Sequence, residues 1–324
     1  MKNTPFFVLI FLMLSCGTTE TAQNADSQKS TAPEKTAQRT LEYVTALGDS
    51  VYSSDSPSES MLQKYEEALA NYRQDPTDAD NIIWLGRRTA YLGRYQEAIT
   101  IYSKGIALHP TDARMYRHRG HRYISSRAFD QAIIDFENAA ALIAGTEDQT
   151  EPDGIPNAQN TPVSTLHSNI WYHLGLVYYV KNDLPNAERC YEAGAKVSKN
   201  DDMIVSNTHW QYMTFKRLGK EQEANELLSP IKPEMDIIEN GSYHRLVQMY
   251  KGILAVEDLQ GKGGDPYKDA VMYGVGNWYL YNEDSLNARK TYETLLETGN
   301  KASFVYIAAE ADYVRVFANS EAGK

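Results

Sequence analysis

Apolar residues recur every three or four positions through most of the chain after residue 40, which is the spacing of one face of an α-helix. No stretch alternates apolar and polar residues between turns as strands do, so the body from about Leu41 to Ala318 is predicted to be helical. The pattern is clearest from Ile82 to Pro110, where a segment with Gly86 and a segment with Ala98 flank a short Gly-Arg turn. This pattern predicts a helical hairpin.

The hairpin pattern repeats along the chain. Pro76-Thr77-Asp78-Ala79 recurs 34 residues later as Pro110-Thr111-Asp112-Ala113, and a second hairpin follows it. Such a period is typical of a solenoid, in which each unit is too small to bury its own apolar face and stacks on its neighbours. The predicted hairpins lie near residues 79–110, 113–144, 168–199, 203–231 and 268–298, with an irregular insertion at 145–165.

The hairpins resemble the tetratricopeptide repeat (TPR). In the second hairpin the positions that match its pattern include Gly120, Phe129, Ala132 and Phe136, whereas Arg119 stands where the family has Leu. The resemblance implies an all-α fold, a right-handed α-solenoid of TPR-like helix hairpins. Within each hairpin, a Gly on one helix and an Ala on the other let the backbones approach while aromatic rings fill the space around them.

The segments outside the five hairpins are predicted to complete the array. Four helical segments are expected there: a degenerate N-terminal pair at 41–52 and 61–72, a single amphipathic helix at 243–259, and a closing helix at 304–316. A terminal repeat must present a polar face to water, and Glu310, Asp312 and Arg315 are expected to supply it.

The first 16 residues predict an export signal. One Lys precedes a nine-residue apolar run from Phe6 to Leu14, which is too short to cross a bilayer as a helix. Met13-Leu14-Ser15-Cys16-Gly17 resembles a bacterial lipobox, with Met13 where Leu is preferred, and this implies lipidation of Cys16. The alternative is an ordinary signal peptide with an incidental Cys. Residues 17–40 are polar without an apolar period and predict a flexible tether.

This N-terminus predicts a protein of the bacterial cell envelope, lipid-anchored, with the periplasmic face of the outer membrane as the expected site. The 324 residues carry a net charge of −11, which argues against nucleic acid as a partner because phosphate binding needs a basic surface. Walker, HExxH, GxSxG and CxxC motifs do not occur, so no enzymatic activity and no cofactor are predicted. Cys190 is expected to be a buried thiol.

In TPR proteins the first helix of each hairpin lines a concave groove, on the side opposite the hairpin contact. Helical geometry then nominates a ligand groove made of Arg87, Tyr91, Arg117, His121, Tyr172, Leu176, Tyr179, His209, Met213 and Lys216. These residues are cationic and aromatic within an acidic protein. They predict a protein or peptide partner with an acidic segment or a C-terminal carboxylate. A solvated positive face without a ligand is the alternative.

The histidines suggest a second class of function. His118 and His121 lie three apart on one predicted helix, and His173 lies on the equivalent helix of the next hairpin, so a metal-binding or hydrolytic envelope protein is the alternative to a scaffold. Spacing supplies no third ligand, so packing is favoured over metal binding. A related ladder of Trp84, His118, His173 and Trp210 predicts either inter-repeat packing or a ligand surface.

Overall fold

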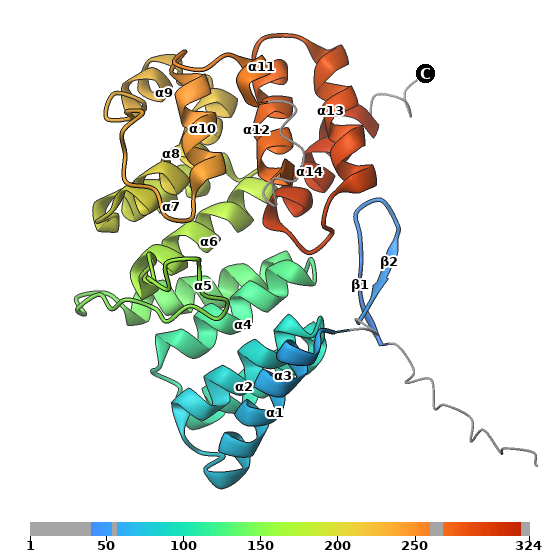
Figure 1. The fold of residues 1–324 in the computed structure, drawn as a ribbon, viewed down its shortest axis with the longest axis vertical. Coiled ribbons are helices and arrows are strands. Elements are labelled where there is room, and N and C mark those ends of the chain that lie inside the picture. The colour runs from blue at the N-terminus through green and yellow to red at the C-terminus, as the bar shows by residue number, and fades with distance from the viewer. Residues whose placement is uncertain (1–39, 54–56, 260–267, 319–324) are drawn as a thin grey trace, which may run out of the picture. The chain divides into compact units, whose positions relative to one another are not determined.

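The computed structural model describes residues 40–53, 57–259 and 268–318 (Figure 1). The chain divides into two units, Met1–Gln38 and Arg39–Lys324, and all the described residues belong to the second. The predicted signal peptide, Cys16 and the predicted tether up to residue 39 therefore lie outside the described residues. In the part that is described, none of the helices is long and apolar enough to cross a bilayer.

The described chain is dominated by helix hairpins, which confirms the predicted all-α solenoid. The antiparallel pairs are α2 (Ala79–Tyr91) with α3 (Tyr95–Leu108), α4 (Ala113–Ser125) with α5 (Phe129–Leu142), α6 (Leu166–Val180) with α7 (Leu184–Val197), α8 (Asp201–Leu218) with α9 (Glu221–Leu227), and α12 (Lys268–Tyr281) with α13 (Ser285–Thr298). The recurring Asp of the Pro-Thr-Asp-Ala motif begins α2 and α4, because Asp78 and Asp112 each cap a helix by accepting a backbone N–H bond.

One contact recurs inside the hairpins and holds their helices close together. An aromatic ring of the second helix lies against a glycine of the first, so that a Cβ on Gly120 would stand 2.8 Å from Phe136 Cε2 and a Cβ on Gly175 2.7 Å from Tyr191 Cε1. Gly276 meets Tyr292 in the same way at 3.0 Å. These positions need glycine because any side chain would force the helices apart, as the repeat pattern predicts.

The segment 41–52 is a β-hairpin, so its prediction as a helix was wrong. Strand β1 (Leu41–Val44) pairs antiparallel with β2 (Ser50–Tyr52), and Tyr43 lies opposite Val51. The connecting turn contains Gly48 at φ +91°, a conformation that favours glycine and ends any helical path. Helix α1 (Glu59–Gln74) packs on α2, and the described residues before it form the β-hairpin instead of the expected paired helix.

The β-hairpin joins distant parts of the array. Glu42 accepts a hydrogen bond from the backbone N–H of Gln96 at the start of α3 (2.9 Å), and Tyr43 donates its hydroxyl to the carbonyl of Lys301 (3.1 Å). Figure 1 shows the hairpin beside the end of α13 and the turn that follows it. The β-hairpin therefore connects an early repeat to the C-terminal helices.

The last part of the chain also differs from prediction. The single helix expected at 243–259 is two helices, α10 (Gly241–Tyr250) and α11 (Val256–Leu259), separated by a turn with Gly252 at φ +78°. Glycine in this conformation ends a helix because it satisfies the last carbonyls by a tight turn. The closing segment forms α14 (Phe304–Tyr313) and continues as a π-helix (Val314–Ala318).

Candidate ligand-binding site

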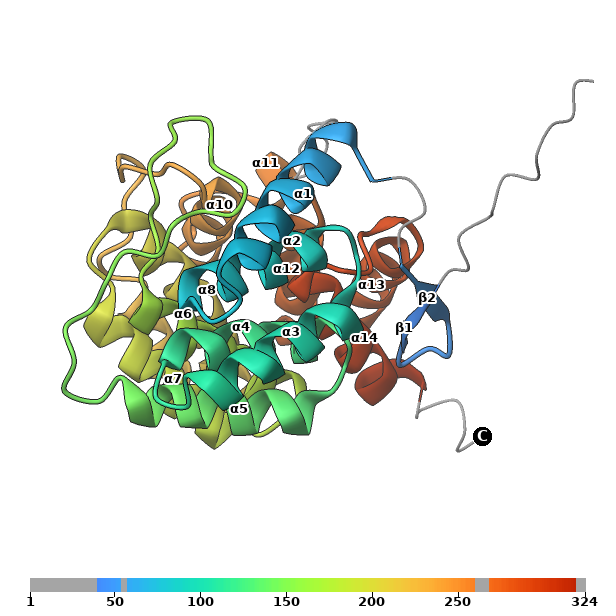
Figure 2. The same ribbon diagram turned by 90° about the horizontal axis from the view of Figure 1, so that it is seen from below.

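The concave face is partly filled by the chain's own C-terminus. Helix α14 packs against α4, α6 and α12, all of which are first helices of hairpins (Figures 1 and 2). Phe304, at the start of α14, contacts both His121 and His173, with its ring centroid 4.8 Å from that of His121 and 5.1 Å from that of His173. The position expected for a peptide ligand is thus occupied by a helix of the same protein.

The acidic residues of α14 form ion pairs with arginines of the helix hairpins. Glu310 pairs with Arg127 at 2.5 Å and Asp312 with Arg217 at 3.2 Å, and Arg315 also contacts Asp312. Glu310 is only 1% exposed and Asp312 4%. The prediction that Glu310 and Asp312 form a polar outer face was therefore wrong, because a carboxylate buried among arginines is stabilised by ion pairing rather than by water.

The insertion at 145–165 covers another part of the concave face. Glu151 lies 3.1 Å from Arg117 Nε and 3.4 Å from His118 Nε2, and Arg88 donates to the carbonyl of Gly154 at 2.7 Å. Gly154 touches Tyr91 so closely that a Cβ would lie 1.7 Å from the tyrosine oxygen. The insertion therefore packs against the first helices, and this close contact requires glycine at position 154.

The predicted groove does not exist as one open surface, and this is a correction. Leu176, Tyr179, His209 and Met213 are fully buried, and Arg117 is 7% exposed. Arg87, Tyr91, His121, Tyr172 and Lys216 keep part of their surface. The reason is a further layer over the first helices: His209 stacks on Tyr243 and Tyr250 of α10, at 4.7 and 5.9 Å between ring centroids.

The histidines are packing residues of this layered interior. His118 stacks on Tyr102 and His173 on Phe136, each with 5.7 Å between ring centroids, so this ladder packs one repeat on the next. Burial lowers the pKa of His173 and of His209 to about 3, and those of His118 and His121 well below the ordinary value, chiefly through desolvation. They are neutral at physiological pH.

The metal-binding alternative finds no support at these residues. Within the described ranges no three His, Cys, Asp or Glu side chains converge so as to hold a metal ion. Cys190, which is fully buried, has its pKa raised to about 12 by desolvation and is therefore a thiol rather than a thiolate ligand.

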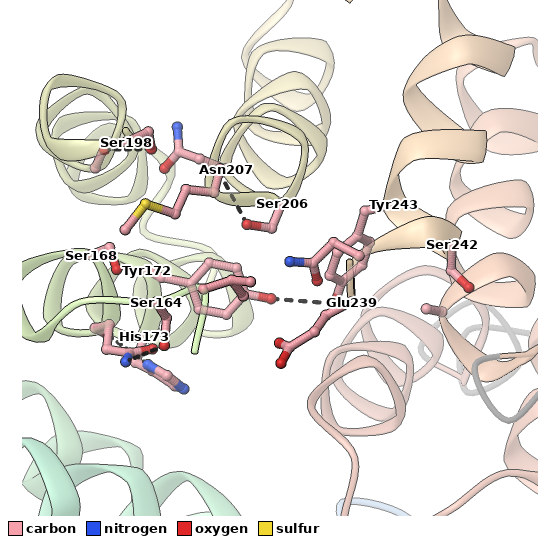
Figure 3. A pocket seen from close by; sticks show the side chains of 16 residues that line it. Ser164, Ser168, Tyr172, His173, Ser198, Ser206, Asn207, Glu239, Ser242 and Tyr243 are labelled. Atoms are coloured by element: carbon pink, nitrogen blue, oxygen red, sulfur yellow. Dashed lines mark hydrogen bonds between the residues drawn. The ribbon is translucent and has the colours of Figure 1, made fainter. Parts of the chain in front are cut away.

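One pocket with both polar and apolar lining residues opens where the first helices are not covered. It has a volume of about 340 Å³, within the range of ligand sites, and lies between the end of the insertion, α6, α7, α8 and the start of α10 (Figure 3). Its walls combine hydroxyl, amide and aromatic side chains with one carboxylate: Ser164, Ser168, Asn169, Tyr172, His173, Ser198, Ser206, Asn207, Glu239, Asn240, Ser242 and Tyr243. Lys and Arg do not occur among its lining residues.

Hydrogen bonds within the wall leave the pocket rich in acceptors. Three of the five lining serines, Ser168, Ser198 and Ser206, donate their hydroxyl hydrogens to backbone carbonyl oxygens. Asn207 donates its amide to the carbonyl of Tyr191 at 3.0 Å, but its Oδ1 has no hydrogen-bond partner among the described residues although the residue is only 6% exposed. This oxygen is itself buried beside Gly194, so the acceptors offered to a ligand are those of the serine side chains.

Glu239 is the charged group of the pocket. Its Oε1 accepts a hydrogen bond from Asn157 Nδ2 at 2.6 Å. Burial raises the pKa of Glu239, and the neighbouring carboxylates Asp153 and Asp202 raise it further, whereas the Asn157 bond lowers it. Within the described residues Glu239 forms no ion pair, so its charge is available to a ligand.

The sequence identified only part of this pocket. Tyr172 was nominated for the groove and His173 for the ladder, and both line the pocket. The serines carry no motif, and Glu239 stands in a loop between α9 and α10 whose approach to α6 has no periodic signal. A richness of Ser and Asn on the first helices is the one feature of the sequence that could have pointed to the site.

Comparisons with known proteins give similarity in fold. No protein-family model and no curated protein matches the chain. Among solved structures the chain is similar to YrrB, a TPR protein with an unusual peptide-binding site, at 16% identity over 76% of this chain and 98% of that one, with a TM-score of 0.42. It is also similar to kinesin light chain TPR-like repeats of Podosopora anserina, at 16% identity over 74% and 98% with a TM-score of 0.41.

A third similarity is to the TPR domain of P58(IPK), at 12% identity over 81% of this chain and 95% of that one, with a TM-score of 0.24. The glycine–aromatic contacts that recur from hairpin to hairpin, rather than these similarities, define the described chain as a TPR-like α-solenoid.

Proposed function

We propose that this protein is a non-enzymatic scaffold that binds a peptide segment of a protein partner in the pocket between α6, α8, α10 and the insertion. The observation that carries the proposal is a pocket of about 340 Å³ in which the hydroxyl oxygens of Ser168, Ser198 and Ser206 are acceptors, because their hydrogens are donated to the backbone. Extended peptides present backbone N–H groups that satisfy such acceptors. Among the lining residues no hydroxyl is hydrogen-bonded to a histidine, so the pocket lacks an activated nucleophile.

The acidic or carboxylate partner expected from the sequence is not retained in this proposal. Two of the cations on which it depended are already paired within the chain, since Arg117 pairs with Glu151 and Lys216 with Glu221. A second acid would have to displace a carboxylate that is already in place. The pocket itself offers no cation to a carboxylate ligand.

The pocket is tested with a random peptide display library and the full-length chain. Ser206→Trp is expected to weaken the selected peptides by about tenfold or more, because the indole ring fills space that they occupy. Thr294→Trp, on the exposed surface of α13, is the matched control and is expected to bind as wild type does. Calorimetry on the purified variants gives the affinities. Peptides that bind Ser206→Trp as tightly as wild type, or a library without enrichment, would contradict the proposal.

The proposal places the scaffold in the bacterial cell envelope, attached to the membrane through lipid on Cys16. Its support is the apolar run from Phe6 to Leu14 followed by Ser15-Cys16-Gly17. Several acyl chains on one residue would anchor the protein stably, since each buried CH₂ contributes about 0.8 kcal/mol.

Cys16→Ala is expected to abolish incorporation of a labelled fatty acid and to move the protein out of the membrane fraction. Cys190→Ala is the control, because that thiol is buried in α7 and its loss leaves Cys16 available. Labelling and fractionation of both variants decide the matter. If the Cys16→Ala protein still carries label and sediments with membranes, Cys16 is not the anchor.

A further inference from the structure

The one charged side chain in the lining of the pocket is a carboxylate. Glu239 is in its wall, and Asp153 and Asp202 lie close enough to raise the pKa of Glu239. Asp202 is 1% exposed and accepts hydrogen bonds from the backbone N–H groups of Ile238, Glu239 and Asn240 at 2.7 to 2.9 Å. Asp202 therefore holds the loop that presents Glu239, and both carboxylates contribute negative potential. A group that enters this pocket meets a field that favours positive charge.

The polar wall has the same preference. The hydroxyl hydrogens of Ser168, Ser198 and Ser206 are donated to the backbone, so these oxygens can only accept from a ligand. Asn169 donates its amide to Glu151 and Ser164 at 2.8 and 3.0 Å, which leaves no hydrogen of that amide for a ligand. A carboxylate or phosphate would be desolvated in this wall with few donors in return. A group with several N–H donors would be well solvated by it.

Two tyrosines complete the site on the side that faces Glu239. Figure 3 shows Tyr172 and Tyr243 directed toward each other, with their hydroxyl oxygens 3.2 Å apart, and Glu239 beside them. Trp210 Nε1 donates to the Tyr172 oxygen at 2.7 Å and thereby fixes its position. The two tyrosines therefore form a fixed aromatic wall of the pocket beside Glu239.

We propose, on the basis of the function proposed above, that the pocket recognises a cationic nitrogen group of the bound peptide, with the Glu239 carboxylate as its counter-charge. A lysine ammonium, an arginine guanidinium and a free N-terminal amine share this chemistry. Each is a donor without an acceptor lone pair, which matches a wall of acceptors.

The test compares short probes that differ in one group. Calorimetry with the full-length chain measures Ac-Ala-Xaa-Ala-amide with Xaa as Lys, Arg, norleucine or Glu, and the uncapped peptide Ala-Ala-Ala-amide. At least one of the three cationic probes is expected to bind about tenfold more tightly than the norleucine peptide. Which of the three does so identifies the source of the cation. The Glu peptide is expected to bind more weakly than norleucine.

Glu239→Gln keeps the shape of the side chain and removes its charge, so the cationic preference is expected to fall below about threefold. Glu234→Gln, an exposed carboxylate of the same loop, is the control and should leave the preference intact. Circular dichroism verifies that both variants are folded. The inference would be overturned if the norleucine or Glu probe bound as tightly as the cationic probes, or if the cationic preference survived Glu239→Gln. It would also be overturned if no cationic probe bound at concentrations up to about 10 mM. Library peptides that bind in a Ser206-dependent manner would still support the proposed function.

Discussion

Glu310→Ala is expected to lower the free energy of unfolding by about 3–5 kcal/mol, which is the range for removing one partner of a buried ion pair. Glu310 accepts hydrogen bonds from Arg127 and from the backbone N–H of Ala46, so one carboxylate links α14 to the α4–α5 turn and to the β-hairpin. Arg127 has a side chain that is 9% exposed. Without Glu310 its charge would remain buried and unmatched.

The change also tests the conclusion that the concave face is filled by α14. Hydrogen exchange of the α14 amides is expected to accelerate in Glu310→Ala before the hairpins α2–α3 and α6–α7 are affected, since these have their own glycine–aromatic contacts. Glu297→Ala, on the exposed face of α13, is the matched control. Urea unfolding supplies the free energies. A loss similar to that of Glu297→Ala, with exchange in α14 unchanged, would show that this ion pair does not hold the helix in place.

Gly120→Leu is expected to cost about 3 kcal/mol, at the upper end for overpacking, because the new side chain begins 2.8 Å from the ring of Phe136 and has nowhere to extend. Phe136 is fully buried between α4 and α5 and cannot swing into solvent. The two helices must move apart, and the stacking of Phe136 on His173 of the next hairpin is then lost as well. The loss of packing therefore extends to the next hairpin.

Gly241→Leu is the control for this substitution, because Gly241 begins α10, is exposed and would meet nothing within 4 Å of a new Cβ. It is expected to change stability by less than about 0.5 kcal/mol. The stability of Gly120→Ala should lie between those of the two Leu variants, since it adds only the first side-chain atom, Cβ. Urea midpoints rank the three variants. Equal midpoints for Gly120→Leu and Gly241→Leu would mean that α4 and α5 are not held at this glycine.

Local features of the fold were predictable because they depend on neighbours in the chain. Asp78 and Asp112 begin helices through their own side chains, and Gly120 with Phe136 lies within one hairpin. The β-hairpin was missed for a related reason: β1 and β2 have only four and three residues, too few for a period to distinguish them from one helical turn. The turn at Gly48 was the available signal.

The sequence by itself determined the helices, their pairing into hairpins, the stacking period and the rows of aromatic residues, since each follows from side-chain spacing along a helix. Only the tertiary structure decided what covers those rows. Glu310 lies 183 residues from Arg127, and Glu151 lies on an insertion without a period. Their approach depends on how the small rotation between repeats accumulates until the C-terminal helix meets the first helices. The total rotation is set by packing at every interface between repeats. No sequence motif therefore indicates which part of the concave face is filled and which part remains a pocket.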